Sequence, residues 1–453
     1  MDNNSKTIAE FLGISPDLVE DTVTVSSEGL RTVHVYPADT GRECPFCGSI
    51  DAEAKGRKCK KMKHALFLRA TTVFILHQRR FRCRSCGKSF NQRTPFGAKG
   101  ARLTYETEML ILESLADYNE TYASVAKRLH VSSTAVIDVF DRRYNPARDR
   151  LPEALCIDEC YAMGQFAKPY CLILYDWSRK RLVDVLEGRE KRQLRSYLFA
   201  IPAEERAAVK VVSIDMYETY LDMARAYLPN ALVCVDSFHV MQNLTRALDA
   251  VRVRVMKGFA RDTDEYHYLK TGEWALYADG EPSEKKKRDR VTGRYHNAYT
   301  LREEIRGISK ELRRAHDYYR FYRFYNSVKM DKARARKWID FMRKDGSVSD
   351  IPEMAAFQRT LTNWRQYIIN SFEYEESTGR RISNGPVEGF NSQYKKLMRV
   401  SNGLGNFPRF RARLMLCSRK DFTMSSPKGG IKRKKRGRKR GHYNKKKEAK
   451  QGT

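Results

Sequence analysis

Short apolar runs rich in β-branched residues recur through the middle of the chain and predict a buried sheet. We expect strands at residues 154–158, 170–175, 181–186, 209–215 and 231–236. Between and after these runs the apolar positions follow a helical period, most clearly at 189–200 and 216–228. The predicted order is therefore strand, strand, strand, helix, strand, helix, strand, helix, which indicates an α/β domain.

Three carboxylates stand at the ends of predicted elements. Asp158 and Asp215 close the first and fourth runs, and Glu388 begins a later predicted helix. Asn391 and Lys395 follow Glu388 on the same helical face. A single aspartate at a strand end is more often a cap or a turn residue. Three acids in this order instead favour a site that holds divalent metal against phosphate, and the order is typical of a ribonuclease H-like fold.

The blocks around these acids resemble the DDE transposases of bacterial insertion sequences, specifically the ISL-three family. The resemblance covers nearly the whole chain and is most specific in the last block. It implies that Asp158, Asp215 and Glu388 are a catalytic triad holding Mg²⁺ (or Mn²⁺), and that an Asp-x-x-His element places His239 near them. The matching residues are 157–159, 213–216, 229–231, 236–240, 383–391, 395, 399, 405–407 and 410–413.

A long interval separates Asp215 from Glu388 and predicts an inserted domain at about 258–380, charged and mostly helical by pattern. Within it, residues 318–325 interleave aromatic side chains with arginines. This segment forms either a surface that stacks bases and binds phosphate or an amphipathic helix that buries its rings, and we favour the second. Trp338 and Trp364 are likewise interpreted as core residues.

The chain is strongly basic, with a net charge of +31 and a pI of about 9.7. From Pro427 onward it carries thirteen Lys or Arg and one Glu, so we expect a disordered basic tail that binds polyanions. The rest of the chain is basic in its own right, which favours a DNA partner. We find neither a membrane-spanning apolar run nor a signal-peptide pattern, and expect a cytoplasmic, nucleoid-associated bacterial protein.

Two CxxC pairs, Cys44 with Cys47 and Cys83 with Cys86, each precede a glycine. Four thiolates at this spacing predict a tetrahedral zinc ribbon. Two disulfides or unrelated thiols are the alternative, which a reducing compartment disfavours. One strand is expected between the pairs, at 66–76. The other candidate zinc ligands are Cys59, His64 and His77, and the remaining cysteines are interpreted as core residues: Cys156, Cys160, Cys171, Cys234 and Cys417.

Residues 122–140 have the form of a helix-turn-helix, with Val125 and Leu129 facing a core and Ser132 or Ser133 capping the second helix. Such a helix can lie in a major groove, although an ordinary helical hairpin shows the same pattern. Residues 145–152 are expected to link this region to the catalytic domain. The full set of predicted DNA contacts is Arg79, Arg80, Arg82, Ser132, Ser133, Asn391, Lys395, Arg399 and Arg411.

The sequence thus predicts a multidomain DDE transposase that binds terminal inverted repeats, acts on target DNA, and works as a homodimer or larger assembly. Two readings compete: a DNA-binding regulator with an inactive transposase fold, and a metal-dependent nuclease that does not join strands. We divide the chain into a zinc-ribbon domain, a helix-turn-helix with its linker, the first part of the catalytic core, a helical insertion, the last part of the core, and the tail. The corresponding ranges are 1–100, 101–150, 151–257, 258–380, 381–425 and 426–453.

Overall fold

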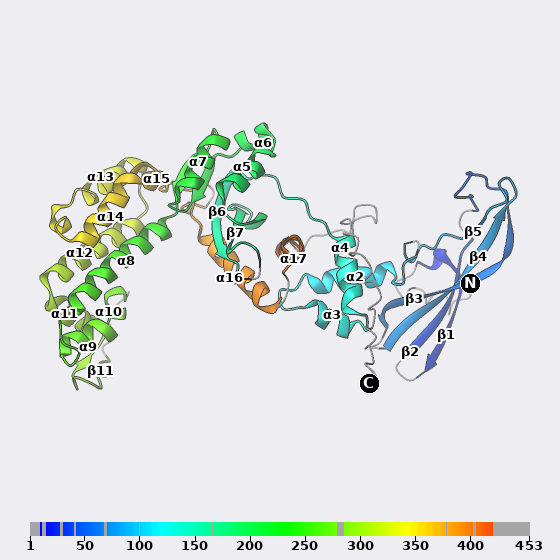
Figure 1. Cartoon of the computed structure of the whole chain (residues 1–453), viewed down its shortest axis with the longest axis horizontal. Coiled ribbons are helices and arrows are strands. Elements are labelled where there is room, and N and C mark those ends of the chain that lie inside the picture. Colours follow the sequence, from blue (N-terminus) through cyan, green and yellow to red (C-terminus); the bar gives the residue numbers. More distant parts are fainter. Residues whose placement is uncertain are drawn as a thin grey trace, which may run out of the picture. The chain divides into compact units, whose positions relative to one another are not determined.

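The computed structural model describes residues 10, 15–27, 30–39, 42–67, 70–98, 100–164, 166–278, 285–376, 378–401 and 405–419. The predicted basic tail lies outside the described residues. The chain divides into two compact units, residues 1–146 and residues 147–421, whose elements are labelled in Figure 1. No described helix combines the length and the apolar character needed to cross a membrane.

The first unit begins with a sheet in the order β1-β2-β4-β3, with β5 paired to β4. Only the β2–β4 pair is parallel. The sheet packs over a small core that includes Val33, Met62 and Phe74. Its elements are a 3₁₀ turn Pro16–Leu18 and the strands β1 Val19–Ser27, β2 Leu30–Pro37, β3 Ala52–Phe67, β4 Ala70–Cys83 and β5 Ser89–Asn91.

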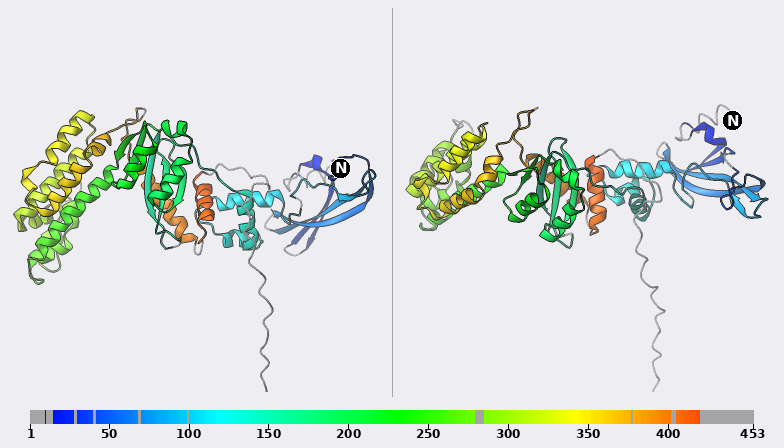
Figure 2. Two further views of the ribbon diagram at one scale, coloured as in Figure 1. Left: turned by 45° about the horizontal axis from the view of Figure 1, so that its top comes forward. Right: turned by 90° about the horizontal axis from the view of Figure 1, so that it is seen from above.

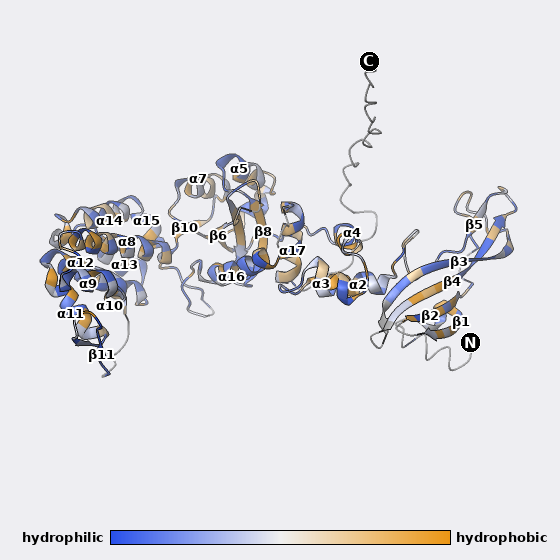
Figure 3. Cartoon of the chain, turned by 60° about the horizontal axis from the view of Figure 1, so that its bottom comes forward, coloured by the Kyte–Doolittle hydropathy of each residue, from blue (hydrophilic) through white to orange (hydrophobic). Residues whose placement is uncertain are grey.

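The single strand predicted at 66–76 is wrong, because two long antiparallel strands, β3 and β4, lie on either side of residues 68–69. β3 forms the edge of the sheet and carries exposed lysines such as Lys58 and Lys61. Charge on an edge strand opposes pairing with further chains. The same lysines interrupt the apolar pattern of β3, so a search for apolar runs does not detect this strand. Figure 3 shows the hydrophobic positions along β4.

Three helices follow the sheet: α2 Tyr105–Leu115, α3 Tyr122–Arg128 and α4 Ser133–Arg143. The predicted helical pair is present, with Val125 and Leu129 buried. His130 adopts a left-handed φ of 51° at the turn, and the Ser132 side chain caps α4 by accepting from the Ala135 backbone N–H at 3.1 Å. The buried carboxylate of Glu108 on α2 binds arginines of α4.

The second unit is built on a sheet in the order β10-β9-β6-β7-β8. β6, β9 and β10 are parallel, whereas β7 runs antiparallel to both of its neighbours. Apolar side chains of α5 and α7 pack with the sheet in one core. The elements are β6 Ala154–Tyr161, β7 Tyr170–Asp176, β8 Arg181–Glu187, α5 Lys191–Phe199, α6 Ala203–Ala207, β9 Val211–Ile214, α7 Glu218–Tyr227, β10 Leu232–Val235 and α8 Ser237–Met256.

This element order agrees with the predicted order, apart from the short additional helix α6. One detail of the prediction is wrong: Asp158 does not end its strand, because β6 continues to Tyr161 while paired with β7. The parallel pairing of β6 with β9, however, stops at Cys156. Asp158 therefore lies just beyond the end of the parallel β6–β9 pairing. Asp215, the residue directly after β9, lies at the same end of that pairing.

The long helix α8 leads from the sheet into a mainly helical part with its own large core, which the views of Figure 2 also show as a bundle of helices. Its elements are α9 Asp264–Thr271, α10 Trp274–Tyr277, β11 Lys287–Arg288, β12 Tyr295–His296, α11 Ala298–Ile308, α12 Lys310–Ser327, α13 Lys332–Met342, a 3₁₀ turn Gly346–Val348, α14 Pro352–Asn363 and α15 Arg365–Asn370. The chain then returns to the sheet through α16 Gly385–Val400 and α17 Phe407–Arg419.

Candidate active site

Strand alternation places the two neighbouring acids of β6 on opposite faces of the sheet. Glu159 points toward α7, where it accepts a hydrogen bond from the Tyr220 hydroxyl at 2.5 Å and pairs with Arg189 at 2.6 Å. Asp158 points toward α16, where its Oδ2 accepts from Nδ2 of Asn391 at 2.8 Å. Glu159 is therefore held in structural bonds, and Asp158 belongs to the site.

Asp158, Asp215 and His239 form a tight group, with one ligand atom from each lying within 4.8 Å of the others. Asp215 directly follows β9, and His239 lies in the first turn of α8. The imidazole Nε2 of His239 lies 2.8 Å from Oδ1 of Asp215. The parallel ends of β9 and β10 bring these side chains to one edge of the sheet.

Glu388 enters the site from the first turn of α16, as predicted for a residue at a helix start. It is not a member of the tight group of Asp158, Asp215 and His239. Burial raises the pKa of Glu388, and the charge of Asp236 raises it further. Glu388 thus lies within reach of the charges of Asp236 and Asp215, about one helical turn before Asn391, which binds Asp158.

Two further residues complete the site, and we had assigned neither of them a role. Asp236 is 1% exposed and accepts from the backbone N–H of Asn384 at 3.1 Å. The buried Asn384 side chain donates to the backbone oxygen of Ile157 at 3.2 Å and reaches Oδ1 of Asp215 at 3.5 Å. Asp236 and Asn384 both lie in the blocks that carry the family resemblance, which was the signal available in the sequence.

Crowding of acids shifts the protonation of the site. Burial and the charge of Asp215 raise the pKa of Asp158 to about 7. Burial alone would lower the pKa of His239, but the hydrogen bond and charge of Asp215 outweigh it and raise this pKa to about 9. The hydrogen bond with Asp215 thus favours the protonated form of the His239 ring in the absence of metal.

The donor set fits a hard divalent cation. Within the described part of the chain, four buried side-chain oxygens of this site have no hydrogen-bond donor. Buried acceptors are normally satisfied, and Mg²⁺ or Mn²⁺ takes carboxylate and amide oxygens as ligands. These atoms and the carboxylates of Asp158 and Asp215 are oxygen ligands of the kind that such a cation prefers. The four atoms are Asp236 Oδ2, Asn384 Oδ1, Glu388 Oε1 and Asn391 Oδ1.

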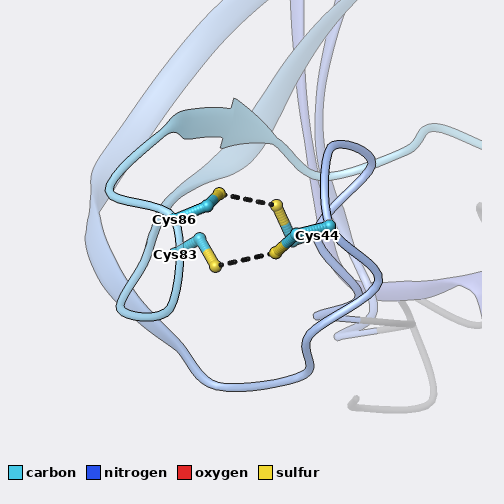
Figure 4. A group of neighbouring side chains, drawn as sticks. Cys44, Cys83 and Cys86 are labelled. Carbon is cyan, nitrogen blue, oxygen red and sulfur yellow. Dashed lines mark hydrogen bonds between the residues drawn. The ribbon is translucent and has the colours of Figure 1, made fainter.

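The four cysteines of the two CxxC pairs lie together, with their sulfur atoms all within 4.8 Å of one another, and Figure 4 labels Cys44, Cys83 and Cys86 of this group. The Sγ atoms of Cys44 and Cys86 are 3.6 Å apart, as are those of Cys47 and Cys83. A disulfide would bring the sulfurs to about 2.0 Å, whereas tetrahedral zinc with Zn–S bonds of about 2.3 Å separates them by roughly 3.8 Å. The geometry therefore fits a Cys₄ zinc site.

The backbone of each knuckle supports thiolates. The glycine after each pair has a positive φ, 75° at Gly48 and 69° at Gly87, and donates its N–H to the carbonyl of the first cysteine at 2.9 Å. The backbone N–H of Cys86 lowers the pKa of Cys83 to about 6. The pKa of Cys47 is instead raised, because its contacts with Cys83 and the other sulfurs together outweigh the backbone hydrogen bond of Ser49. The crowded metal-free sulfurs therefore ionise unequally. An ionised sulfur is the form that binds zinc.

The other candidate zinc ligands lie outside this four-cysteine group. Cys59 Sγ lies 3.5 Å from Nδ1 of His77, whose Nε2 lies 2.9 Å from Nδ1 of His34. His64 is buried and its Nδ1 lies 3.0 Å from the hydroxyl of Thr104. The five cysteines interpreted as core residues are all buried.

Comparison with known proteins decides the family. The family profile of ISL3-type DDE transposases, described as transposase, matches residues 155–414, which include every residue of the acidic site around Asp158 and Asp215 but not the four-cysteine group. The chain belongs to the ISL3 family of DDE transposases.

Two named relatives agree with this assignment. The transposase for insertion sequence element IS1001 of Bordetella parapertussis is 22% identical over 253 residues, which cover 54% of this chain and 61% of the relative. The transposase for insertion sequence element IS1557 of Mycobacterium tuberculosis is 34% identical over 85 residues, which cover 19% of each chain. The matched regions thus span less than two thirds of each relative.

The predicted DNA contacts of this ISL3-family protein differ in how they are held. In the first unit Arg80 and Arg82 are exposed, whereas Arg79 is paired with Glu20 and lies 3.7 Å from Asp39. Ser132 and Ser133 lie exposed at the start of α4. Of these candidates, Arg79 is the one already engaged within the sheet.

The candidates of the second unit divide in the same way. Lys395 and Arg399 are exposed along α16. Arg411 on α17 instead donates to the buried carboxylate of Asp184 on β8, and Asn391 holds Asp158. Lys395 and Arg399 are thus the side chains of this set that present charge to solvent.

Proposed function

We propose that this protein is the transposase of a bacterial insertion sequence, which binds the terminal inverted repeats of its element and cuts and joins DNA strands with Mg²⁺ (or Mn²⁺). The observation that carries the proposal is the convergence of acids and unsatisfied oxygens at one edge of the sheet. Asp158, Asp215 and Glu388 are the proposed catalytic acids.

The arrangement of the sheet supports a ribonuclease H-like catalytic core. Numbered within this domain, the strands lie in the order 5-4-1-2-3, with strand 2 antiparallel. The first acid lies on strand 1, the second follows strand 4 and the third lies on a late helix. We propose that residues 151–257 and 381–425 make up this core and that 258–380 are a helical insertion.

Each side chain of the site has a proposed task. Asp158, Asp215 and Glu388 would hold the divalent ions, which supply Lewis-acid stabilisation of an in-line phosphoryl transfer. Asn391 orients Asp158, and Asn384 fixes Asp236 beside Asp215. His239 would hold Asp215, as its 2.8 Å contact supports, and would donate a hydrogen bond to a phosphate oxygen.

For DNA recognition we propose that residues 1–100 form a zinc-ribbon domain and 101–150 a helix-turn-helix with its linker. The sulfur geometry of Cys44, Cys47, Cys83 and Cys86 supports structural zinc, and the capped, exposed start of α4 supports entry into a groove. The basic tail, 426–453, would add sequence-independent affinity. In the DNA complex we propose a homodimer or larger assembly.

The decisive experiment is strand transfer from a pre-cut end of the element into plasmid DNA, with Mg²⁺. Asp215→Asn and Glu388→Gln should abolish joining while gel-shift binding of the ends persists, because both changes keep the shape of the side chain. Asp222→Asn, on the outer helix α7 and paired with Lys191, is the matched control and should remain active.

The same assay, run in parallel on an uncut end of the element, separates the two competing functions. A protein that cuts the end but never joins it is a nuclease. A protein that binds the ends and neither cuts nor joins them is a regulator with an inactive fold. Either result refutes the proposed transposition chemistry.

A further inference from the structure

Aromatic side chains of α12 and α13 meet and are partly exposed in the helical part, whose helices are labelled in Figure 1. The segment 318–325 is divided by its helical period: Tyr318, Tyr319 and Tyr322 are buried as expected, but Phe321 and Phe324 point outward. Phe321 is 40% exposed, Phe324 63%, and Phe341 of α13 54%. The preferred interpretation of this segment, that its rings are buried, is therefore wrong for the two phenylalanines.

The exposed rings form one connected cluster. The ring centroids of Phe321 and Phe341 are 5.6 Å apart, and Tyr325 lies 4.7 Å from Phe321 and 5.3 Å from Phe324. Tyr325 in turn stacks on the buried Trp338 at 6.1 Å. We call Phe321, Phe324, Tyr325 and Phe341 the aromatic face. Because Tyr325 is anchored on the buried Trp338, the aromatic face should lose little side-chain freedom when a ligand stacks on it.

Positive charge surrounds the aromatic face. Arg334 and Lys337 precede Phe341 by two turns and one turn on the same side of α13, and both are exposed. Arg320 and Lys344 are also exposed. The nearby acids are used within the protein: Asp317 binds Arg306 at 2.6 Å, and Asp331 caps α13.

We propose that the aromatic face binds unpaired nucleotides of a DNA strand, with bases stacked on the phenylalanines and phosphates bound by the flanking cations. Exposed aromatic rings combined with positive charge are the recognition elements for single strands, and an intact duplex offers phosphates but no free base faces. Exposed cations lie beside the rings, and the nearby exposed acids Asp317 and Asp331 are engaged within the protein, so the surface suits a polyanion better than an uncharged apolar partner. The proposal deepens the proposed function by naming unpaired DNA as a ligand.

The test measures binding of the full-length protein to a fluorescent dT₂₀ strand and to a hairpin duplex of equal phosphate number at fixed salt. Phe324→Ala and Phe341→Ala should each weaken binding of the single strand roughly tenfold and leave duplex binding unchanged. Phe199→Ala is the matched control, because Phe199 is 74% exposed on α5, away from the cluster. It should bind both probes like the native protein.

Conservative variants separate stacking from folding. Phe324→Trp should retain single-strand binding, whereas Phe324→Leu, which stays apolar but cannot stack, should lose it. Arg334→Gln with Lys337→Gln should reduce the slope of log affinity against log salt for the single strand. All variants are compared at equal helicity by circular dichroism.

Three results would overturn the proposal. Unchanged single-strand binding in Phe324→Ala and Phe341→Ala removes its basis. Equal losses for single strand and duplex indicate a general phosphate surface. A dimer that becomes monomeric in Phe341→Ala indicates an interface between copies. Ring-dependent single-strand binding in a protein that fails to join strands would leave this proposal standing and refute only the proposed function.

Discussion

Replacing Asp158 by asparagine should make the metal-free protein more stable. Asp158 is 5% exposed and lies beside Asp215, which is the carboxylate that the imidazole of His239 binds directly. Burial and the charge of Asp215 raise its pKa from 3.8 to about 7. A buried carboxyl with a raised pKa opposes folding whenever it is ionised. An amide of the same shape carries no charge and should therefore increase the free energy of unfolding.

The size of the effect follows from the pKa shift. Each pKa unit corresponds to about 1.4 kcal/mol, so a shift of about three units sets an upper limit of roughly 4 kcal/mol at pH 8. The amide keeps an acceptor for Asn391 but loses the attraction of the His239 cation. We therefore expect Asp158→Asn to raise the free energy of unfolding by about 1–3 kcal/mol.

The pH dependence has a definite sign. Because the pKa of Asp158 is higher in the folded state, its carboxyl favours folding fully only below the unfolded pKa near 4. That contribution is lost as pH rises toward 7. The advantage of Asp158→Asn should thus be small at pH 4, grow between pH 4 and 7, and stay constant above that range.

The assay is urea denaturation of the full chain in EDTA at pH 4 and pH 8. A separate titration with Mg²⁺ and no EDTA first identifies which unfolding transition of the native protein belongs to the unit that holds the site. Mg²⁺ should stabilise the native protein at pH 8 and have little effect on the variant, which lacks a ligand. Asp184→Asn is the control: Asp184 is buried in the same sheet but is bound by Arg411 and Tyr197, so its loss should destabilise.

Two outcomes refute the reasoning. If Asp158→Asn is no more stable than the native protein at pH 8 in EDTA, the repulsion between the charges of Asp158 and Asp215 that the geometry indicates does not destabilise the fold. If the variant gains as much at pH 4 as at pH 8, its gain has another origin than the carboxylate.

Three further predictions concern other parts of the chain. Cys83→Ser should lose zinc by elemental analysis and with it discrimination of the element's ends, because zinc organises a ribbon with little core; full zinc content would contradict this. Glu108→Gln should lower the free energy of unfolding of the first unit by about 3–5 kcal/mol, since it removes the buried carboxylate that binds the guanidinium of Arg143; a loss under 1 kcal/mol would show that this ion pair adds nothing. Truncation after Ser426 should weaken binding to all DNA equally and flatten its salt dependence, and lost preference for the ends would instead make the tail a reader of sequence.

The sheet of the second unit could be predicted because its strands are buried on both faces. Such strands appear as continuous apolar runs, and an acid that interrupts or ends a run is visible at once, as at Asp158 and Asp215. The same rule failed for β3, whose edge position lets lysine alternate with apolar residues. A search for apolar runs detects buried strands and overlooks strands with one wet face.

Asp236 and Asn384 show the other limit of the sequence. Their hydrogen bond joins positions 148 residues apart, and no local pattern reports a contact of that range. The exposed phenylalanines of α12 show a third limit of prediction from the sequence. The helical period separates inward-facing from outward-facing rings, but it does not predict which outward-facing rings another helix covers. Packing of α13 beside α12 decides that question.

The residues that hold α16 against the sheet are largely neutral amides. Asn391 binds Asp158, and Asn384 binds the backbone of Ile157, so the docking of the helix does not depend on Glu388. Substituting the acids by amides should consequently leave the helix in place while it removes the charge that a divalent ion needs. Loss of joining in an acid-to-amide variant can then be assigned to chemistry, whereas Asn384→Ala should impair both joining and stability. A joining defect in Asn384→Ala without any loss of stability would show that Asn384 acts on the reaction directly rather than through the placement of α16.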